Sequence, residues 1–285
     1  MSLAPLRRLI PVRRYREPLA LVAVLRLSGV IGRLGPLRSG LELAPLEQII
    51  ERAFGIRGLS AVALAINSPG GSAVQSALIC RRIRAAAEEA GVPVFAFAED
   101  VAGSGGYWLA LAGDEIYADA SSIVGAIGVL FRGFGFAEAI ARLGIERRVH
   151  TAGVRKAALD PFRPENPEEV AMLAELQADV HAAFKEAVRA RRGDRLRAPE
   201  EELFSGAFWS GRRGVELGLV DGLGDLRSVM RAKYGDRVRL REVSARRPWL
   251  RRRFGLGVAT PDPSALGAGL IAALEERAIW ARFGL

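Results

Sequence analysis

The sequence predicts an α/β protein whose sheet is mostly parallel and is flanked by helices. Two observations carry this prediction. Apolar runs that contain no charged residue, at 61–66 and 94–98, are typical of strands buried on both faces of a sheet. Segments with helical spacing separate these runs, and repeated strand–helix alternation favours parallel strands joined by crossover helices.

Local signals assign the elements in chain order. A run of helical spacing that Gly55 closes predicts the first helix, and Ser72 and Gly91 are the start and stop signals of the second. Acidic residues in the first turn and arginines in the last turn suit the dipole of the longest helix, at 167–191. The expected strands are 20–27, 61–66, 94–98, 115–118, 128–131 and 146–150. The expected helices are 45–54, 73–90, 107–112, 136–143, 167–191, 215–219 and 226–234.

The composition is that of a globular protein with material for a large core. The 285 residues are 50% hydrophobic and 26% charged, with a formal net charge of +9. The single cysteine, Cys80, excludes an internal disulfide and a multi-cysteine metal site, and it is expected in the core. Because His150 and His181 are the only histidines, a histidine-rich metal centre is excluded as well. No metal and no cofactor is expected.

Three regions are expected along the chain. Residues 1–18 form a basic N-terminal extension, 19–236 the main domain, and 237–285 an arginine-rich tail with an amphipathic helix at 266–283. No apolar run is long enough for a signal peptide or a membrane span, so a cytoplasmic protein is expected. The tail is read first as a solvated surface or subunit contact. Its interleaved Trp249 and Phe254 give the alternative of peripheral contact with the inner membrane. Nucleic-acid binding is not expected, since no recognition motif accompanies the charge.

Two glycine turns carry the candidate chemistry. Gly70-Gly71 follows one buried strand, and the turn that contains Ser104 follows the next. Strand ends of a parallel sheet meet at one edge, so the N–H groups of Gly71 and Gly105 can face one oxygen beside the Ser104 hydroxyl. Such an oxyanion hole contributes roughly 2.7–4 kcal/mol per donor to transition-state stabilisation. The pair of turns therefore predicts acyl transfer, although each turn alone is more typical of a plain turn without chemistry.

A serine nucleophile needs a base, and the sequence offers few. Lys156 lies in a loop with apolar neighbours, after the strand expected to end at His150. A lysine acts as a base near neutral pH only when dry surroundings favour its uncharged amine. Lys156 is the first choice on this ground and His150 is the second, although the residues alone favour an ordinary exposed loop lysine at 156.

Several motifs together resemble the signal peptide peptidase A (SppA) family over residues 21–234. They are VALAINSPGG at 62–71, GSGGYW at 103–108, GAIGV at 125–129, GVRK at 153–156 and VELGLVD at 215–221. The resemblance implies a ClpP/crotonase-like spiral fold and a serine endopeptidase that cleaves hydrophobic peptides such as signal-peptide remnants. It also implies ring-shaped homo-oligomers, in some cases with catalytic residues from neighbouring subunits. By position, it makes Ser104 the nucleophile, Lys156 the general base, Gly71 and Gly105 the oxyanion hole, and Gly70, Gly103 and Gly106 substrate-binding residues.

The sequence departs from the SppA pattern at two positions near the proposed site. Ala126 stands where family members commonly have a serine, whose hydroxyl could orient the lysine amine. Gly103 stands where alanine is frequent. A counterpart of the N-terminal membrane anchor of well-known members is not expected.

Three alternatives remain open. A ClpP-type protease needs a histidine after its serine, and none lies between Ser104 and His150. A crotonase-type acyl-CoA enzyme would use the same oxyanion hole with carboxylates for proton transfer, for which Glu99 and Asp100 are candidates. A non-catalytic scaffold that retains the fold is the third, and Ala126 favours it.

Overall fold

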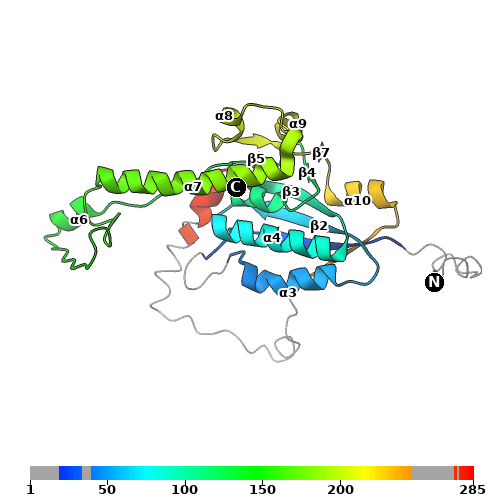
Figure 1. Cartoon of the computed structure of the whole chain (residues 1–285), viewed down its shortest axis with the longest axis horizontal. Coiled ribbons are helices and arrows are strands. Elements are labelled where there is room, and N and C mark those ends of the chain that lie inside the picture. Colours follow the sequence, from blue (N-terminus) through cyan, green and yellow to red (C-terminus); the bar gives the residue numbers. More distant parts are fainter. Residues whose placement is uncertain (1–18, 34–39, 245–272, 275) are drawn as a thin grey trace, which may run out of the picture.

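A sheet of eight strands runs through the described part of the protein, and it is parallel except at one edge (Figure 1). The computed structural model describes residues 19–33, 40–244, 273–274 and 276–285. The strand order is β6-β5-β3-β2-β1-β8, and β4 pairs with β3 and β7. Only β5 and β6 pair in antiparallel fashion. The strands are β1 Leu21–Ser28, β2 Leu59–Ser68, β3 Val94–Gly103, β4 Glu115–Ala118, β5 Ile123–Gly125, β6 Phe208–Ser210, β7 Gly222–Leu223 and β8 Arg239–Glu242.

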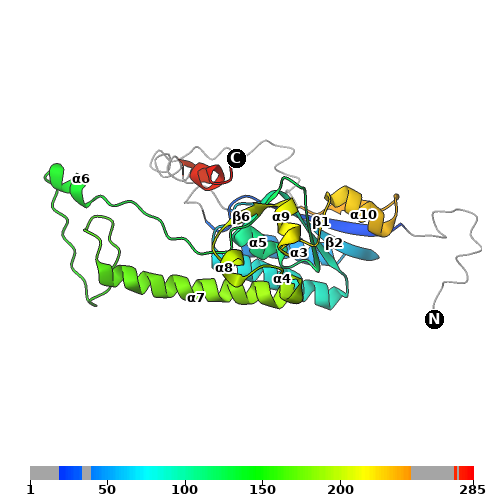
Figure 2. The ribbon, with the colours of Figure 1, turned by 90° about the horizontal axis from the view of Figure 1, so that it is seen from above.

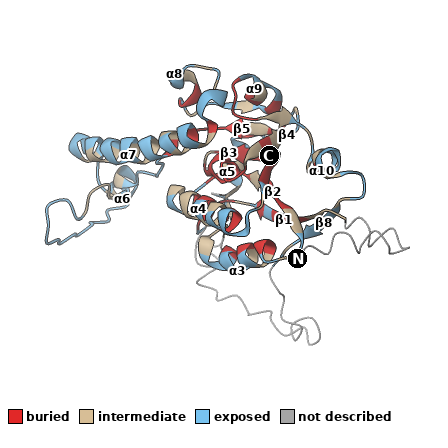
Figure 3. Ribbon diagram, turned by 45° about the vertical axis from the view of Figure 1, so that its right-hand side comes forward, coloured by how far each residue is buried: buried red, intermediate tan, exposed pale blue. Residues whose placement is uncertain are grey.

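Both faces of the central strands are buried, as their continuous apolar sequences require. Side chains point alternately to the two faces of a strand. Leu64 and its neighbours two positions away join the larger core with α3 and α4, whereas Ala63 and Ala65 join a smaller core under Met230 of α10. Figure 3 shows this buried centre under exposed outer helices.

The helices lie outside the sheet. They are α3 Leu43–Phe54, α4 Ala73–Ala90, α5 Gly105–Ala110, α6 Ala137–Arg142, α7 Pro167–Arg192, α8 Glu200–Leu203, α9 Gly211–Glu216 and α10 Leu226–Tyr234, with a 3-10 turn at Gly193–Arg195. The predicted caps of α4 are confirmed, because Ser72 accepts a hydrogen bond from Gln75 N–H and Gly91 follows in the left-handed conformation. Cys80 is buried in the core as expected.

The predicted fold class is confirmed: the chain has an α/β fold with a mostly parallel sheet flanked by helices. Two predicted strands, 128–131 and 146–150, are wrong, since these residues form no strand. The predicted helix at 215–219 lies earlier, at Gly211–Glu216. The expected tail begins inside the sheet, because β8 pairs with β1. The predicted extension at 1–18 and most of the tail lie outside the described residues.

The predicted strand at 146–150 and the second half of the one at 128–131 lie on an arm, residues 130–166, that leaves the body after β5 and returns at the start of α7. Figure 2 shows the arm and the first half of α7 extending away from the sheet. No strand of the sheet lies beside the arm, so its β-prone residues have no ladder to join. Its tip folds on itself instead: the rings of Phe136 and Phe162 lie 5.5 Å apart, and Arg147 donates to Asp160 at 2.8 Å.

Candidate active site

Ser104 occupies the point where β3 ends and α5 begins. Its φ of 52° and ψ of −119° lie outside the regions that non-glycine residues ordinarily adopt. Two hydrogen bonds hold this conformation: Ser104 N–H donates to Gly125 O at 2.7 Å, and Trp108 N–H donates to Ser104 O at 3.0 Å. Strained backbone of this kind concentrates at functional sites, where surrounding structure maintains it. The junction therefore holds a half-buried serine in a fixed orientation.

The two glycine turns lie side by side, as predicted. A Cβ placed on Gly70 would be 2.8 Å from Ser104 Cβ and 2.9 Å from Gly105 N, and one placed on Gly105 would be 3.4 Å from Gly71 N. Within the described residues, neither Gly71 N–H nor Gly105 N–H donates a backbone hydrogen bond. Two uncommitted donors thus border the Ser104 side chain, which is the arrangement that an oxyanion hole requires.

Replacing Gly70 with alanine is expected to lower the free energy of unfolding by about 2–4 kcal/mol, because strain and a backbone clash add. Gly70 has a φ of +103°, and the new Cβ would also meet Gly103 O at 2.9 Å. Gly58→Ala is the matched control: its φ is +72°, but nothing lies within 4 Å of the new Cβ. Urea denaturation of both variants measures the difference. Equal losses would contradict the close contact of the two turns.

A cavity of about 630 Å³ opens over Ser104. Its wall is aromatic, since the Trp108 and Phe184 rings stack at 4.5 Å with an interplanar angle of 8°. Neither this aromatic wall nor the position of His181 at the cavity was predicted from the sequence. His181 lines the cavity, and its Nε2 is buried and has no hydrogen-bond partner among the described residues. Ala126, Leu130, Arg132, Val180, Phe204, Ile279 and Arg282 also line the cavity.

The predicted bases do not line this cavity within one chain. Lys156 and His150 are both exposed on the arm, and neither is among the cavity residues. Figures 1 and 2 show the arm, which includes α6, at the outer end of α7 and away from the sheet. One chain therefore brings together Ser104 and the two N–H groups, but it does not bring Lys156 to Ser104.

The other predicted glycines contact the protein itself. A Cβ on Gly106 would lie 2.4 Å from Ser68 O, so Gly106 allows α5 to pack closely against the end of β2. A Cβ on Gly103 would lie 3.0 Å from Cζ of Phe283. Both glycines thus provide space at the site.

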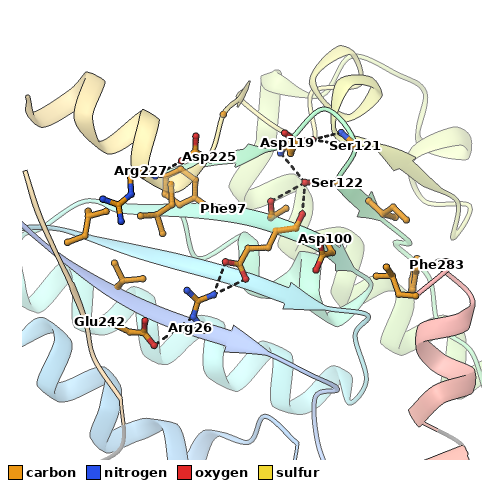
Figure 4. A pocket seen from close by; sticks show the side chains of 18 residues that line it. Arg26, Phe97, Asp100, Asp119, Ser121, Ser122, Asp225, Arg227, Glu242 and Phe283 are labelled. Atoms are coloured by element: carbon orange, nitrogen blue, oxygen red, sulfur yellow. Dashed lines mark hydrogen bonds and ion pairs between the residues drawn. The ribbon is translucent and has the colours of Figure 1, made fainter. Parts of the chain in front are cut away.

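A second cavity, of about 1010 Å³, lies on the other side of the β3 end (Figure 4). Glu99 and Asp100, the candidate carboxylates of a crotonase-type enzyme, face it and are engaged. Arg26 donates to both Glu99 oxygens at 2.8 and 3.0 Å, and Asn67 donates to Asp100 at 2.5 Å. Hydrogen bonds from Ser121 lower the pKa of the nearby Asp119. The geometry therefore gives the crotonase alternative no support.

The described part of the chain contains neither a candidate metal site nor a candidate membrane-spanning helix. No group of three His, Cys, Asp or Glu side chains there is placed to hold a metal ion. No helix among these residues has the length and apolar character needed to cross a bilayer.

Several known proteins are similar to this chain. A Brucella abortus protein named Na(+)/H(+) antiporter NhaA is 49% identical over 288 residues, which cover 98% of this chain but 39% of that protein. Serine protease SPPA, chloroplastic, of Arabidopsis thaliana is 32% identical over 74% of this chain and 32% of its own length. Putative protease slr0021 of Synechocystis is 30% identical over 79% of this chain and 80% of its own length.

The chain thus spans about two fifths of the Brucella relative and most of the Synechocystis one. The family model described as Peptidase family S49 matches residues 86–237, which is more than half of the chain and includes Ser104, Gly105 and Lys156. The resemblance to signal peptide peptidase A is confirmed by this match. The chain belongs to peptidase family S49.

Proposed function

We propose that the chain is a serine endopeptidase with Ser104 as its nucleophile and with Gly71 and Gly105 N–H as its oxyanion hole. The observation that carries this proposal is the strained Ser104 junction beside two uncommitted N–H groups. Membership of peptidase family S49 supports it. The substrates we propose are peptides with hydrophobic segments, such as signal-peptide remnants, because the cavity wall is aromatic and aliphatic.

We propose further that Lys156 acts on Ser104 of a neighbouring copy. The arm that carries Lys156 exposes many large apolar side chains, and monomeric proteins rarely leave such a patch uncovered. These side chains are Leu130, Phe131, Phe134, Phe136, Leu143, Ile145, Val149 and Val154. An arm that docks on the next copy, repeated around a closed ring, buries this surface and brings one lysine to each serine. Apolar surroundings in the interface then favour the uncharged amine that a base requires.

The proposed mechanism has two stages. Uncharged Lys156 Nζ takes the Ser104 hydroxyl proton as Oγ attacks the peptide carbonyl, and the oxyanion forms against Gly71 and Gly105 N–H. The lysine ammonium returns the proton to the departing amine, which leaves an acyl-enzyme on Ser104. The lysine then takes a proton from a water molecule that attacks the ester, and it returns that proton to Ser104 Oγ as the product acid leaves. Each N–H contributes about 2.7–4 kcal/mol to stabilisation of the two tetrahedral intermediates.

Mixed oligomers test both halves of this proposal. Ser104→Ala and Lys156→Ala chains, each inactive alone, are co-expressed with different tags and purified as mixed assemblies. Random mixing in equal amounts joins an intact serine to an intact neighbouring lysine at roughly a quarter of the sites, so about that fraction of wild-type peptidase activity should return. Hydrolysis of a fluorogenic hydrophobic peptide is the measurement.

The control replaces the first chain with the double variant Ser104→Ala/Lys156→Ala. Mixed assemblies of the double variant with Lys156→Ala contain serines but no lysine, and they should stay inactive. Mixed oligomers of the two single variants that remain inactive would overturn the shared site. Wild-type protein that neither cleaves peptides nor reacts with a fluorophosphonate at Ser104 would favour the non-catalytic scaffold.

A further inference from the structure

The C-terminal segment (residues 276–285) lies against the Ser104 region, because Ile279 and Arg282 line the cavity over that residue. Within it, Phe283 is buried to 7% exposure, whereas its neighbours Arg282 and Gly284 are exposed. Figure 4 shows the Phe283 ring turned from the C-terminal segment toward the end of the sheet. Phe283 therefore anchors this segment to the body, and the half-buried Trp280 packs against the same cluster.

The anchor sits in a small apolar cup beside the nucleophile. Phe283 forms a separate core cluster with Val101 and Ala126, and Ile123 packs on its margin. The Phe208 ring meets the Phe283 ring edge-on, with centroids 5.1 Å apart. These contacts bury the aromatic ring on the strand ends that carry the catalytic serine.

Gly103 supplies the space for the ring. A Cβ there would lie 3.0 Å from Phe283 Cζ, 3.3 Å from its Cε1 and 3.4 Å from Val101 Cγ1. Its backbone is not left-handed, so conformation does not demand glycine at this position. The two residues at which the sequence departs from the SppA pattern, Gly103 and Ala126, thus line the same cup. A methyl group at one and a hydroxyl at the other would make it narrower and more polar.

Two residues that line the cup are chain neighbours of Ser104 and of the residue that holds its backbone. Gly103 precedes Ser104, and Ala126 follows Gly125, whose carbonyl accepts the Ser104 N–H. Ile279 and Arg282 of the same segment line the cavity over Ser104, while Phe283 and Leu285 line the second cavity. The segment therefore occupies the space that a peptide must enter to reach Ser104.

We propose that Val101, Gly103 and Ala126 form a binding subsite for an aromatic side chain of a peptide, and that Phe283 of the chain's own C-terminal segment is its resident ligand. This proposal rests on the proposed function, because it makes the cup part of the peptide-binding site of the Ser104 peptidase. A peptide with an aromatic residue in the matching position binds by displacing Phe283. The peptidase accordingly selects hydrophobic peptides that carry an aromatic residue.

Binding of the peptide ERAIWARFGL, residues 276–285, to the full-length Ser104→Ala protein tests the subsite without turnover. In this background, Phe283→Ala empties the cup, and the labelled peptide should bind about tenfold to a hundredfold more tightly than to the protein with Phe283 in place. The same peptide with alanine at the phenylalanine position should lose that gain. Adding Gly103→Ala should weaken peptide binding about fivefold, because the new methyl group narrows the cup.

Leu274→Ala is the matched control, since Leu274 is 60% exposed on the preceding residues of the C-terminal region and should give no gain. An equal affinity with and without Phe283 overturns the subsite, and the proposed function stands if the wild-type protein still hydrolyses peptides. A gain on removal of Phe283, in a protein whose Ser104 shows no peptidase activity, supports the cup as an aromatic site and overturns the proposed function alone.

Discussion

Replacing Ser104 with alanine is expected to lower kcat/KM for peptide hydrolysis by roughly four to six orders of magnitude, because it removes the proposed covalent nucleophile. The substitution removes one oxygen and keeps Cβ, so the contact of Gly70 with Ser104 Cβ is preserved. No hydrogen bond of Ser104 Oγ is found among the described residues, so the fold should lose nothing with it. Steady-state hydrolysis of a fluorogenic peptide measures the loss.

The control for this prediction is Ser228→Ala, which removes a hydroxyl from α10 and should leave hydrolysis unchanged. A fluorophosphonate should label the wild-type and Ser228→Ala proteins but not Ser104→Ala. Thermal unfolding should show the same melting temperature for Ser104→Ala and wild type. Retained hydrolysis in Ser104→Ala would place the nucleophile elsewhere.

Replacing Arg192 with methionine is expected to lower the free energy of unfolding by about 3–5 kcal/mol, because it breaks a buried ion pair and leaves its partner uncompensated. Arg192 is 3% exposed and lies at the end of α7. It donates to Asp221 at 2.7 Å and twice to Gly218 O, at 2.9 and 2.7 Å. These hydrogen bonds connect α7 with the loop before β7, and the substitution removes them. Urea denaturation measures the effect.

Arg195→Met is the matched control, since Arg195 reaches the same carboxylate at 3.2 Å but its side chain is 43% exposed. An exposed pair contributes at most about 1 kcal/mol, so the control should lose far less. Similar losses in the free energy of unfolding for both variants would contradict the prediction that burial makes the Arg192–Asp221 pair the more stabilising one.

The pH dependence of stability follows from Asp221. Burial by itself would raise the pKa of Asp221, but hydrogen bonds from Arg192 and from Ile116 N–H, with the charges of Arg192 and Arg195, lower it overall. A carboxyl pKa that is lower in the folded state stabilises the protein above the unfolded pKa of about 3.9. This contribution is lost as the pH falls through the folded pKa. Arg192→Met should therefore differ most from wild type at neutral pH and least in acid.

The central sheet was predictable because its residues are apolar in every position. The run at 61–66 is buried on both faces in the structure, as a parallel strand between helical layers must be. The run at 128–131 has similar local preferences and forms no strand, since the chain leaves the sheet there and meets no partner. β8 was not predicted because its sequence is mostly charged, although it pairs with β1 at the sheet edge.

Some features of the candidate site could likewise be predicted from the sequence, and others could not. Ser104 and the two glycine turns could be placed together because they follow neighbouring parallel strands. The aromatic wall of Trp108 and Phe184 had no local signal, since the two residues belong to helices distant in the chain. The Phe283 cup was hidden for the same reason.

The sequence by itself determined the α/β class and the pairing of a serine with two glycine N–H groups, because buried strands and sharp turns leave local patterns. Only the tertiary structure decided that Lys156 projects on an arm away from Ser104 and that Phe283 packs against Gly103 and Ala126. Both depend on where distant segments pack. Hydrophobic burial is non-directional, and a local sequence carries no record of the partner that will cover it.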